Sequence, residues 1–327
     1  VVEMDNKETK VSTSNGEKVK IGVAFATEVA ARFQFDEKFM RETAEILGAD
    51  ILFQWANYDQ TKQENQVENL ITQGIDVLIL IGVSNNMSSL VEKVKNEGIP
   101  VVCYDNFIVD APIDAYLDRD NEEAGRIQMR AAMEAIGGKG DIAIIHGEPT
   151  SSVVQGMKIG YDEILADYPD VNIVVEQYHE GYSAEKALKT AENALSANNN
   201  IDAFICTADV LALGILPAIE AADLAGKTFI TGMDCEVAAM QAVYNGTIGI
   251  DIWTEIDKCA IQAVQIAHAL ARDEKFDYDE IVVNGNYEVP KLFVPIVGVT
   301  KDNLEDWVNN ISPEGWITMD QILSAQQ

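Results

Sequence analysis

The chain has 327 residues, with 23 Lys and Arg against 54 Asp and Glu, which gives a formal net charge of −31 at pH 7. Such a charge argues against nucleic acids and anionic membranes as partners, because both require a basic surface that displaces counterions. Hydrophobic residues make up 47% of the chain and charged residues 24%, which is typical of a globular protein and excludes a disordered one. The length favours two domains.

The first 18 residues differ in composition from the rest of the chain. Residues 1–18 are rich in Lys, Glu, Asn, Ser and Thr and have almost no periodic apolar pattern. A segment of this kind cannot bury enough apolar surface to order itself. We therefore expect residues 1–18 to form a flexible tether.

Two similar passes of strands and helices follow the tether. Strands are expected at residues 19–25, 50–56, 75–82 and 100–105 in the first pass, and at 141–147, 171–178, 201–208 and 228–234 in the second. Their near-continuous Val, Ile and Leu, each run being followed by an amphipathic segment, indicate parallel sheets covered by helices on both faces. Two such passes form an internal repeat. The predicted fold class is α/β, with two doubly wound parallel-sheet lobes.

The remaining segments are too short for a third lobe. A strand is expected at 246–253, a helix at 258–273, and two extended runs after it. A chain that crosses between lobes more than once would use these pieces to complete both sheets, so we expect a multi-strand hinge. The predicted N-terminal lobe comprises residues 19–122 and about 258–290, and the predicted C-terminal lobe comprises 123–257 and about 291–327.

Candidate binding residues lie where the predicted strands end, because ligands of open α/β sheets bind beyond the carboxyl ends of the strands. These ends carry Arg32, Phe33, Asp105, Asn106, Tyr182, Asp209, Asp234 and Thr254, and also Arg119, Glu148 and Ser151. Rings, carboxylates, amides and a guanidinium suit a small polyhydroxylated solute, whose hydroxyls they bridge and whose C–H faces they cover. Each Asp at such a turn has an alternative role as a helix N-cap, and for Asp209 the two roles stay equally open.

Motifs for catalysis are absent from the sequence. It has no G-x-x-x-x-G-K-[ST] motif, no G-x-G-x-x-G after the first strand, no G-x-S-x-G and no H-E-x-x-H. Four cysteines lie far apart without a C-x-x-C pair, which favours buried free thiols, and the three histidines lack a second ligand at metal spacing. We therefore expect no catalytic residue, no metal site, no cofactor and no enzymatic activity.

Several runs of the sequence resemble a known family. KVKIGVAF with RFQFD, ILFQWANYDQTKQENQVENLITQGIDVLIL, GIPVVCYDNFI, ALKTAENALSANNNIDAF and GKTFITGMD together resemble type I periplasmic sugar-binding proteins of ABC transporters, over roughly residues 18–300. The resemblance implies the type I periplasmic-binding-protein fold, in which three crossover strands join two lobes that close around one sugar. It also implies capture of a monosaccharide, either a xylose-like pentose or a hexose, and its delivery to an ABC permease.

The resemblance also implies roles for individual residues. Arg32 and Phe33 match the family's Arg and aromatic ring after the first strand, Asp105 matches its hydroxyl-binding Asp, and Tyr182 and Asp234 fall on an aromatic and an acidic position of the second lobe.

At four positions the sequence departs from the family pattern. Asn106 stands where the family usually has Arg, Gln155 falls near a ribose-type Arg, Ala208 replaces an Asn before Asp209, and Thr254 occupies a hinge Lys or Gln position. We expect Asn106, Gln155, Asp209 and Thr254 to set which sugar hydroxyls are recognised.

The resemblance implies a location outside the cytoplasmic membrane. The protein would be either periplasmic or a cell-surface lipoprotein held by an acylated Cys upstream of Val1, since the polar tether fits both. The expected partners are a monosaccharide and an ABC permease, with no nucleic acid, and the expected state is a monomer. An alternative function, which the sequence does not separate from transport, is a sugar sensor that signals to a membrane histidine kinase or chemoreceptor.

Overall fold

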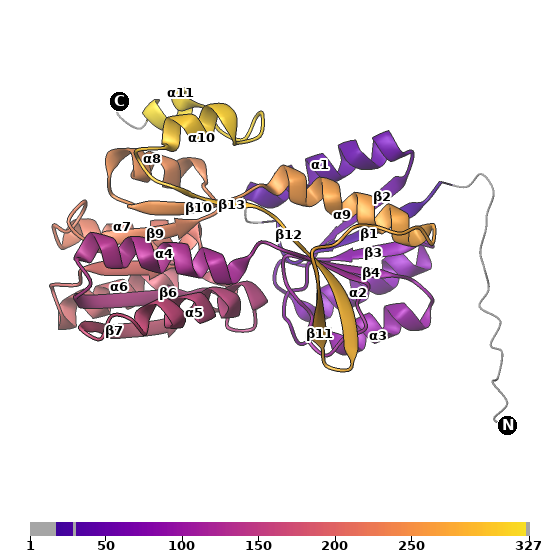
Figure 1. Cartoon of the computed structure of the whole chain (residues 1–327), viewed down its shortest axis with the longest axis horizontal. Coiled ribbons are helices and arrows are strands. Elements are labelled where there is room, and N and C mark those ends of the chain that lie inside the picture. Colours follow the sequence, from indigo (N-terminus) through magenta and orange to yellow (C-terminus); the bar gives the residue numbers. More distant parts are fainter. Residues whose placement is uncertain (1–17, 29–30, 325–327) are drawn as a thin grey trace.

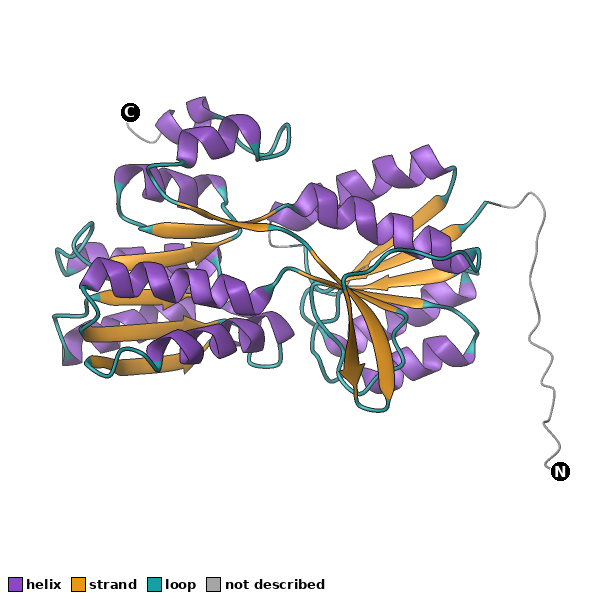
Figure 2. Cartoon of the chain, in the orientation of Figure 1, coloured by secondary structure: helices purple, strands orange, loops and turns teal. Residues whose placement is uncertain are grey.

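The computed structural model describes residues 18–28 and 31–324. The predicted tether, apart from Lys18, lies outside the described residues. Strands and helices alternate along most of the chain and gather around two separate sheets (Figure 1, Figure 2). None of the helices in the described ranges combines the length and apolar character needed to cross a membrane.

The first lobe is a seven-stranded sheet with helices on its faces. Its strands, in the order β11-β12-β5-β4-β3-β1-β2, are β1 (Lys20–Phe25), β2 (Asp50–Trp55), β3 (Val77–Leu80), β4 (Val101–Tyr104), β5 (Ala115–Asp118), β11 (Glu280–Asn284) and β12 (Tyr287–Phe293). Its helices are α1 (Ala31–Leu47), α2 (Gln60–Thr72), α3 (Ser88–Asn96) and α9 (Ile256–Ala271). Only β11 runs antiparallel to its neighbour, and every residue of β3 and β4 is buried, as expected for strands covered on both faces.

The second lobe is a six-stranded sheet. Its strands, in the order β13-β10-β9-β8-β6-β7, are β6 (Gly140–His146), β7 (Val171–Tyr178), β8 (Ala203–Cys206), β9 (Phe229–Met233), β10 (Ile250–Thr254) and β13 (Ile296–Val299). Its helices are α4 (Asn121–Ile136), α5 (Ser152–Leu165), α6 (Ala184–Ala197), α7 (Asp209–Ala221), α8 (Val237–Asn245), α10 (Leu304–Asn310) and α11 (Met319–Leu323), with a 3₁₀ turn at Glu180–Tyr182. Here β13 is the antiparallel strand.

The chain crosses between the two sheets three times, after β5, after β10 and after β12. Val294 N donates to Asp118 O at 2.8 Å and Glu255 N donates to Pro295 O at 3.2 Å, so the three crossings lie side by side. Figure 1 shows them as the narrow connection between the lobes. The predicted fold class, two doubly wound lobes joined by a multi-strand hinge, is confirmed.

Some elements differ from the sequence prediction. The patterns did not indicate β5, α10 or α11, which are short. By sheet membership and packing, the second segment of the first lobe runs from Ile256 to Phe293, against 258–290 in the prediction. Sheet membership does not by itself define independent folding units, so the division into domains stays a prediction.

Two buried glutamines fix the carboxyl ends of the strands. Gln63 of α2 donates to Ala24 O and Ile81 O and accepts from Val83 N, which joins the ends of β1 and β3. Gln128 of α4 donates to Cys206 O and Gly232 O at the ends of β8 and β9. Because both amides are fully buried and hydrogen-bonded, they hold the loops that follow these strands in place.

Candidate functional site

A cavity of about 150 Å³ lies between the lobes, beyond the carboxyl ends of both sheets. Its lining comes from both lobes: Ala26, Arg32, Phe33, Tyr58, Ile81, Gly82, Val83, Asp105, Asn106 and Arg119 of the first, and Glu148, Ser151, Val153, Gly181, Tyr182, Thr207, Ala208, Val210, Asp234 and Glu236 of the second. A cavity of about this volume accommodates a six-membered ring. The site therefore suits a solute the size of one sugar ring.

Six of the nine predicted binding residues line this cavity. Arg32 and Phe33 lie in the first turn of α1, Asp105 and Asn106 follow β4, Tyr182 lies in the 3₁₀ turn after β7, and Asp234 follows β9. Their convergence follows from the topology, because the carboxyl ends of parallel strands meet at one edge of each sheet, and the hinge turns these two edges toward each other.

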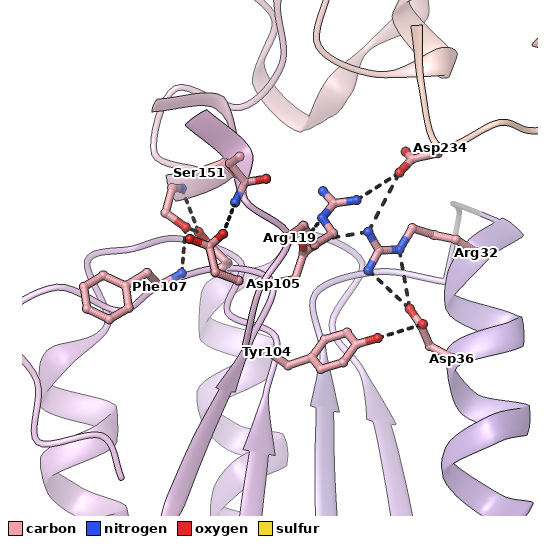
Figure 3. Close-up of polar contacts among 12 residues, drawn as sticks. Arg32, Asp36, Tyr104, Asp105, Phe107, Arg119, Ser151 and Asp234 are labelled. Atoms are coloured by element: carbon pink, nitrogen blue, oxygen red, sulfur yellow. Dashed lines mark hydrogen bonds and ion pairs between the residues drawn. The ribbon is translucent and has the colours of Figure 1, made fainter. Parts of the chain in front are cut away.

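Two guanidinium groups and two carboxylates form a charged cluster in the cavity (Figure 3). Arg119 Nε lies 2.5 Å from Asp105 Oδ1, and Arg119 Nη1 donates to Asp234 Oδ1 at 3.1 Å. Arg32 Nη1 lies 3.7 Å from Asp105 Oδ1 and 3.8 Å from Asp234 Oδ1. Asp234 belongs to the second lobe and the other three to the first, so the cluster spans the cleft.

A third carboxylate, beneath the cavity, orients Arg32. Asp36, one helical turn further along α1, lies 3.4 Å from both Nε and Nη2 of Arg32 and accepts a 2.8 Å hydrogen bond from the Tyr104 hydroxyl. Burial by itself lowers the pKa of Arg32, but the carboxylates of Asp105, Asp36 and Asp234 outweigh it and hold that pKa above its ordinary value. Arg32 is thus a fixed positive charge whose side chain is almost fully buried.

Aromatic rings flank the charged cluster. Phe33 packs on Phe25 at 5.4 Å between ring centroids, and Tyr58 of the first lobe stacks on Tyr182 of the second at 6.0 Å and 30°. Burial raises the pKa of both phenols, so Tyr58 and Tyr182 stay protonated near neutral pH and keep a hydroxyl proton to donate. Such rings present an apolar face and a polar edge to a bound solute.

The backbone at the cavity is strained at four lining residues. Tyr58, Asp105, Tyr182 and Asp234 have φ of 58°, 69°, 53° and 110°. Non-glycine residues rarely adopt such values, and they cluster at ligand sites where the surrounding structure enforces them. The turns that follow β2, β4, β7 and β9 therefore aim these side chains into the cleft.

Three predicted binding residues do not reach the cavity. The Gln155 side chain is engaged by Asn85 Nδ2 and Pro149 O outside the lining. Asp209 is buried behind it and accepts from Glu236 N at 2.8 Å, so it supports the loop after β9 and does not cap α7, whose N-cap is Ala208. Thr254 is buried where the chain leaves β10 for α9. Recognition of sugar hydroxyls by Gln155, Asp209 or Thr254 has no geometric support.

Other lining residues were absent from the predicted set. Arg119, Glu148 and Ser151 follow strands β5 and β6, and the sequence inventory of strand ends contained them without assigning a role. Tyr58 follows β2 and Glu236 lies two residues after Asp234, so the strand-end rule would have found both. Among residues 18–28 and 31–324, no group of three or more His, Cys, Asp or Glu side chains is placed to hold a metal ion.

Comparisons with known proteins agree with this geometry. Residues 21–275 match the sequence profile of the periplasmic binding protein domain family. The chain is 34% identical over 300 residues to the D-xylose-binding periplasmic protein of Escherichia coli strain K12, covering 90% of this chain and 91% of that protein. It is 32% identical over 302 residues to the D-xylose-binding periplasmic protein of Haemophilus influenzae strain Rd, covering 91% of each.

A solved structure is similar over most of the chain. It is the ABC transporter periplasmic solute-binding protein of Actinobacillus succinogenes 130z with bound D-allose, with a TM-score of 0.78, 25% identity, and coverage of 88% of this chain and 100% of that one. The resemblance indicated by the sequence runs is thereby confirmed. With its two lobes, its interlobe cavity and these relatives, the chain belongs to the periplasmic binding protein family.

Proposed function

We propose that this protein captures a monosaccharide, D-xylose or a close relative, between its two lobes and delivers it unchanged to an ABC permease. The observation that carries the proposal is the ring-sized cavity in which Arg32, Arg119, Asp105 and Asp234 converge from both lobes. The names of the D-xylose-binding relatives support this choice of sugar. We also propose a site of action outside the cytoplasmic membrane, in the periplasm or as a surface lipoprotein, and a monomeric state.

The chemistry of the lining fits a neutral polyol. A carboxylate accepts several hydrogen bonds and a guanidinium donates through a planar fork, so Asp105 and Arg119 together can bind a pair of neighbouring hydroxyls. The Asp234 carboxylate, which also pairs with Arg119, can accept hydrogen bonds from sugar hydroxyls on the side of the second lobe. The rings of Phe33 and Tyr182 leave apolar area for the C–H faces of the sugar.

Lobe closure follows from the same arrangement. A solute that contacts Asp105 on one side and Asp234 on the other gains both sets of contacts only when the lobes are together. Its affinity is therefore higher for the closed arrangement, and binding shifts the population toward it. A permease that recognises this closed arrangement distinguishes loaded from empty protein.

The test is a binding panel on the purified protein, by thermal shift and isothermal titration calorimetry. D-xylose, D-ribose, L-arabinose, D-glucose, D-allose and myo-inositol are compared. A sugar at about 1,000 times its dissociation constant stabilises the fold by about 4 kcal/mol, a clear rise in melting temperature. We expect D-xylose to give the largest shift and to be recovered chemically unchanged by NMR. No shift with any sugar, or conversion of the bound sugar, would overturn the proposal.

A further inference from the structure

Beside the cavity, one segment of the second lobe is hydrogen-bonded directly to two loops of the first. The segment runs from Thr150 into the first turn of α5. Asn85, in the loop after β3, donates from its backbone N to Thr150 O at 2.9 Å and from Nδ2 to Gln155 Oε1 at 3.0 Å. Asn85 is only 5% exposed, whereas Gln155 is exposed, so the hydrogen bond between their side chains is partly buried.

The second contact is made by the loop after β4. Asn106 Oδ1 accepts from both the backbone N and the hydroxyl of Ser152, at 2.7 and 2.8 Å, while Asn106 Nδ2 donates to Gly82 O within its own lobe. Phe107 N donates to Ser152 Oγ at 2.6 Å. Ser152 thus accepts from one residue of the first lobe and donates to another.

These contacts account for two of the departures in the sequence. The carbonyl of Asn106 accepts two hydrogen bonds from Ser152, and the carbonyl of Gln155 accepts one from Asn85, so each amide serves a contact between lobes. A longer Arg at either position would present a donor where an acceptor is used. The five hydrogen bonds between this segment and the two loops join protein atoms and require no atom of a solute.

We propose that Asn85, Asn106, Ser152 and Gln155 form a latch that holds the lobes together and populates the closed arrangement before the sugar binds. They are positioning residues, and the latch deepens the proposed function, on which its role in sugar capture rests. Each net hydrogen bond changes a population ratio by about two- to tenfold, so even partial formation of the five moves the balance of open and closed forms substantially.

The lobes also touch away from the latch, through a pair of aromatic rings. Phe35 of α1 meets Trp316 of the second lobe edge-on at 4.8 Å between ring centroids, and Trp316 Nε1 donates to Cys235 O beside Asp234. The charged cluster and the Phe35–Trp316 contact thus supplement the latch.

The latch also affects the apparent affinity for the sugar. Only the closed fraction of the protein binds the sugar with full contacts, so a weaker latch lowers the closed fraction and the apparent affinity by the same factor.

The test compares Ser152→Ala/Gln155→Ala with the native protein by small-angle X-ray scattering without sugar. Neither residue lines the cavity, so the sugar contacts stay intact. The matched control is Ser196→Ala/Gln241→Ala, which removes a serine and a glutamine hydrogen bond inside the second lobe. We expect the latch variant to have the larger radius of gyration, the control to equal the native protein, and Ser152→Thr, which keeps the hydroxyl, to stay compact.

Addition of D-xylose supplies the second measurement. Saturating sugar is expected to return the latch variant to the native radius of gyration, with a dissociation constant about tenfold higher than that of the native protein. If the native protein and the latch variant have equal radii of gyration without sugar, the latch is wrong, whatever the effect of added sugar. If D-xylose binds neither protein, the proposed sugar is wrong, while the comparison without sugar still decides the latch.

Discussion

Arg119 Nη1 donates a 3.1 Å hydrogen bond to Asp234 Oδ1 across the cleft, so a cation of the first lobe is paired with an anion of the second. The same guanidinium lies 2.5 Å from Asp105 through Nε. The side chain of Arg119 is 5% exposed, and burying a charge without its partners is strongly unfavourable. Asp105 already pairs with Arg119 inside the first lobe, and closure adds Asp234 as a second carboxylate partner, so the groups that line the sugar cavity also neutralise one another.

Asp105→Asn tests the charge of the first-lobe carboxylate while keeping its shape. A hydrogen bond to a charged group contributes roughly 1.5 to 3 kcal/mol, so we expect D-xylose to bind at least about tenfold more weakly. Titration calorimetry measures the change. The control is Asp114→Asn, which removes an ion pair with Lys95 at 2.6 Å outside the cavity and is expected to leave affinity unchanged. Native affinity in Asp105→Asn would remove Asp105 from the site.

Asp36→Asn tests the carboxylate beneath Arg32 through the pH dependence of stability. Burial raises the pKa of Asp36 from 3.8 to about 6, a rise that Arg32 and the Tyr104 hydroxyl oppose only in part. Between these values the folded protein holds a proton that the unfolded chain releases, so the contribution of Asp36 to the free energy of unfolding falls as pH rises. Because Asn does not titrate, the free energy of unfolding of Asp36→Asn does not fall in this way as pH rises.

Relative to the native protein, Asp36→Asn should therefore gain up to about 3 kcal/mol of unfolding free energy between pH 4 and pH 7. Urea denaturation at pH 4, 5.5 and 7 gives the difference. Asp223→Asn is the control, because Lys227 lowers the pKa of Asp223, so the stability that Asp223 contributes is lost only below about pH 4 and its difference should stay nearly constant between pH 4 and pH 7. For Asp36→Asn, a difference in unfolding free energy that does not change with pH contradicts the assignment to Asp36.

The sequence could predict the fold and the residues at strand ends that line the cavity, because both depend on local signals. Runs of Val, Ile and Leu mark the strands, and the residue after a parallel strand lies at the binding edge, which is how Arg32, Asp105 and Asp234 were found. The rule is weaker for short, mixed strands. Ala115–Asp118 carries only four residues, and without β5 the role of Arg119 at its end was not assigned.

Side-chain pairings between distant segments could not be predicted. Gln155 meets Asn85, which is 70 positions away in the sequence, and no local pattern indicates that this amide faces another lobe. The Asp209 carboxyl likewise turns to Glu236 N and to Asp251, away from the cavity. Strand ends fix where a backbone emerges, whereas the direction of each side chain depends on packing of the complete fold.

Asp251→Asn tests the buried carboxyl pair behind the Asp234 loop. A Cβ placed on Gly232 would lie 2.5 Å from Asp209 Oδ1 and 2.8 Å from Asp251 Oδ2, so the two carboxyls face each other. Burial raises the pKa of both, and the folded pair therefore keeps a proton that the unfolded chain releases. The native contribution to stability consequently falls as pH rises above about 4.

An amide at position 251 donates to Asp209 without any bound proton. We expect the melting temperature of Asp251→Asn to exceed that of the native protein by at least about 4 °C at pH 8 and to match it at pH 4. Scanning calorimetry at both pH values measures this. Asp251→Ala, which leaves Asp209 without that partner, should be less stable than Asp251→Asn at both. A melting temperature of Asp251→Asn below native at pH 8 contradicts a shared proton.

Gly147→Ala tests how Tyr182 is placed in the cavity. A Cβ at Gly147 would lie 2.1 Å from Cε1 of the Tyr182 ring, so an added methyl group forces the ring to move. Overpacking of this kind costs about 1 to 3 kcal/mol, and we expect D-xylose affinity to fall about tenfold or more. In a Tyr182→Ala background the methyl meets no ring, so the same change should alter affinity by less than about twofold. Calorimetry on the native protein, the two single variants and the double variant gives the coupling energy between positions 147 and 182. An equal effect of Gly147→Ala in both backgrounds would show that the methyl acts elsewhere, for example on the hydrogen bond from Gly147 N to Thr207 Oγ1.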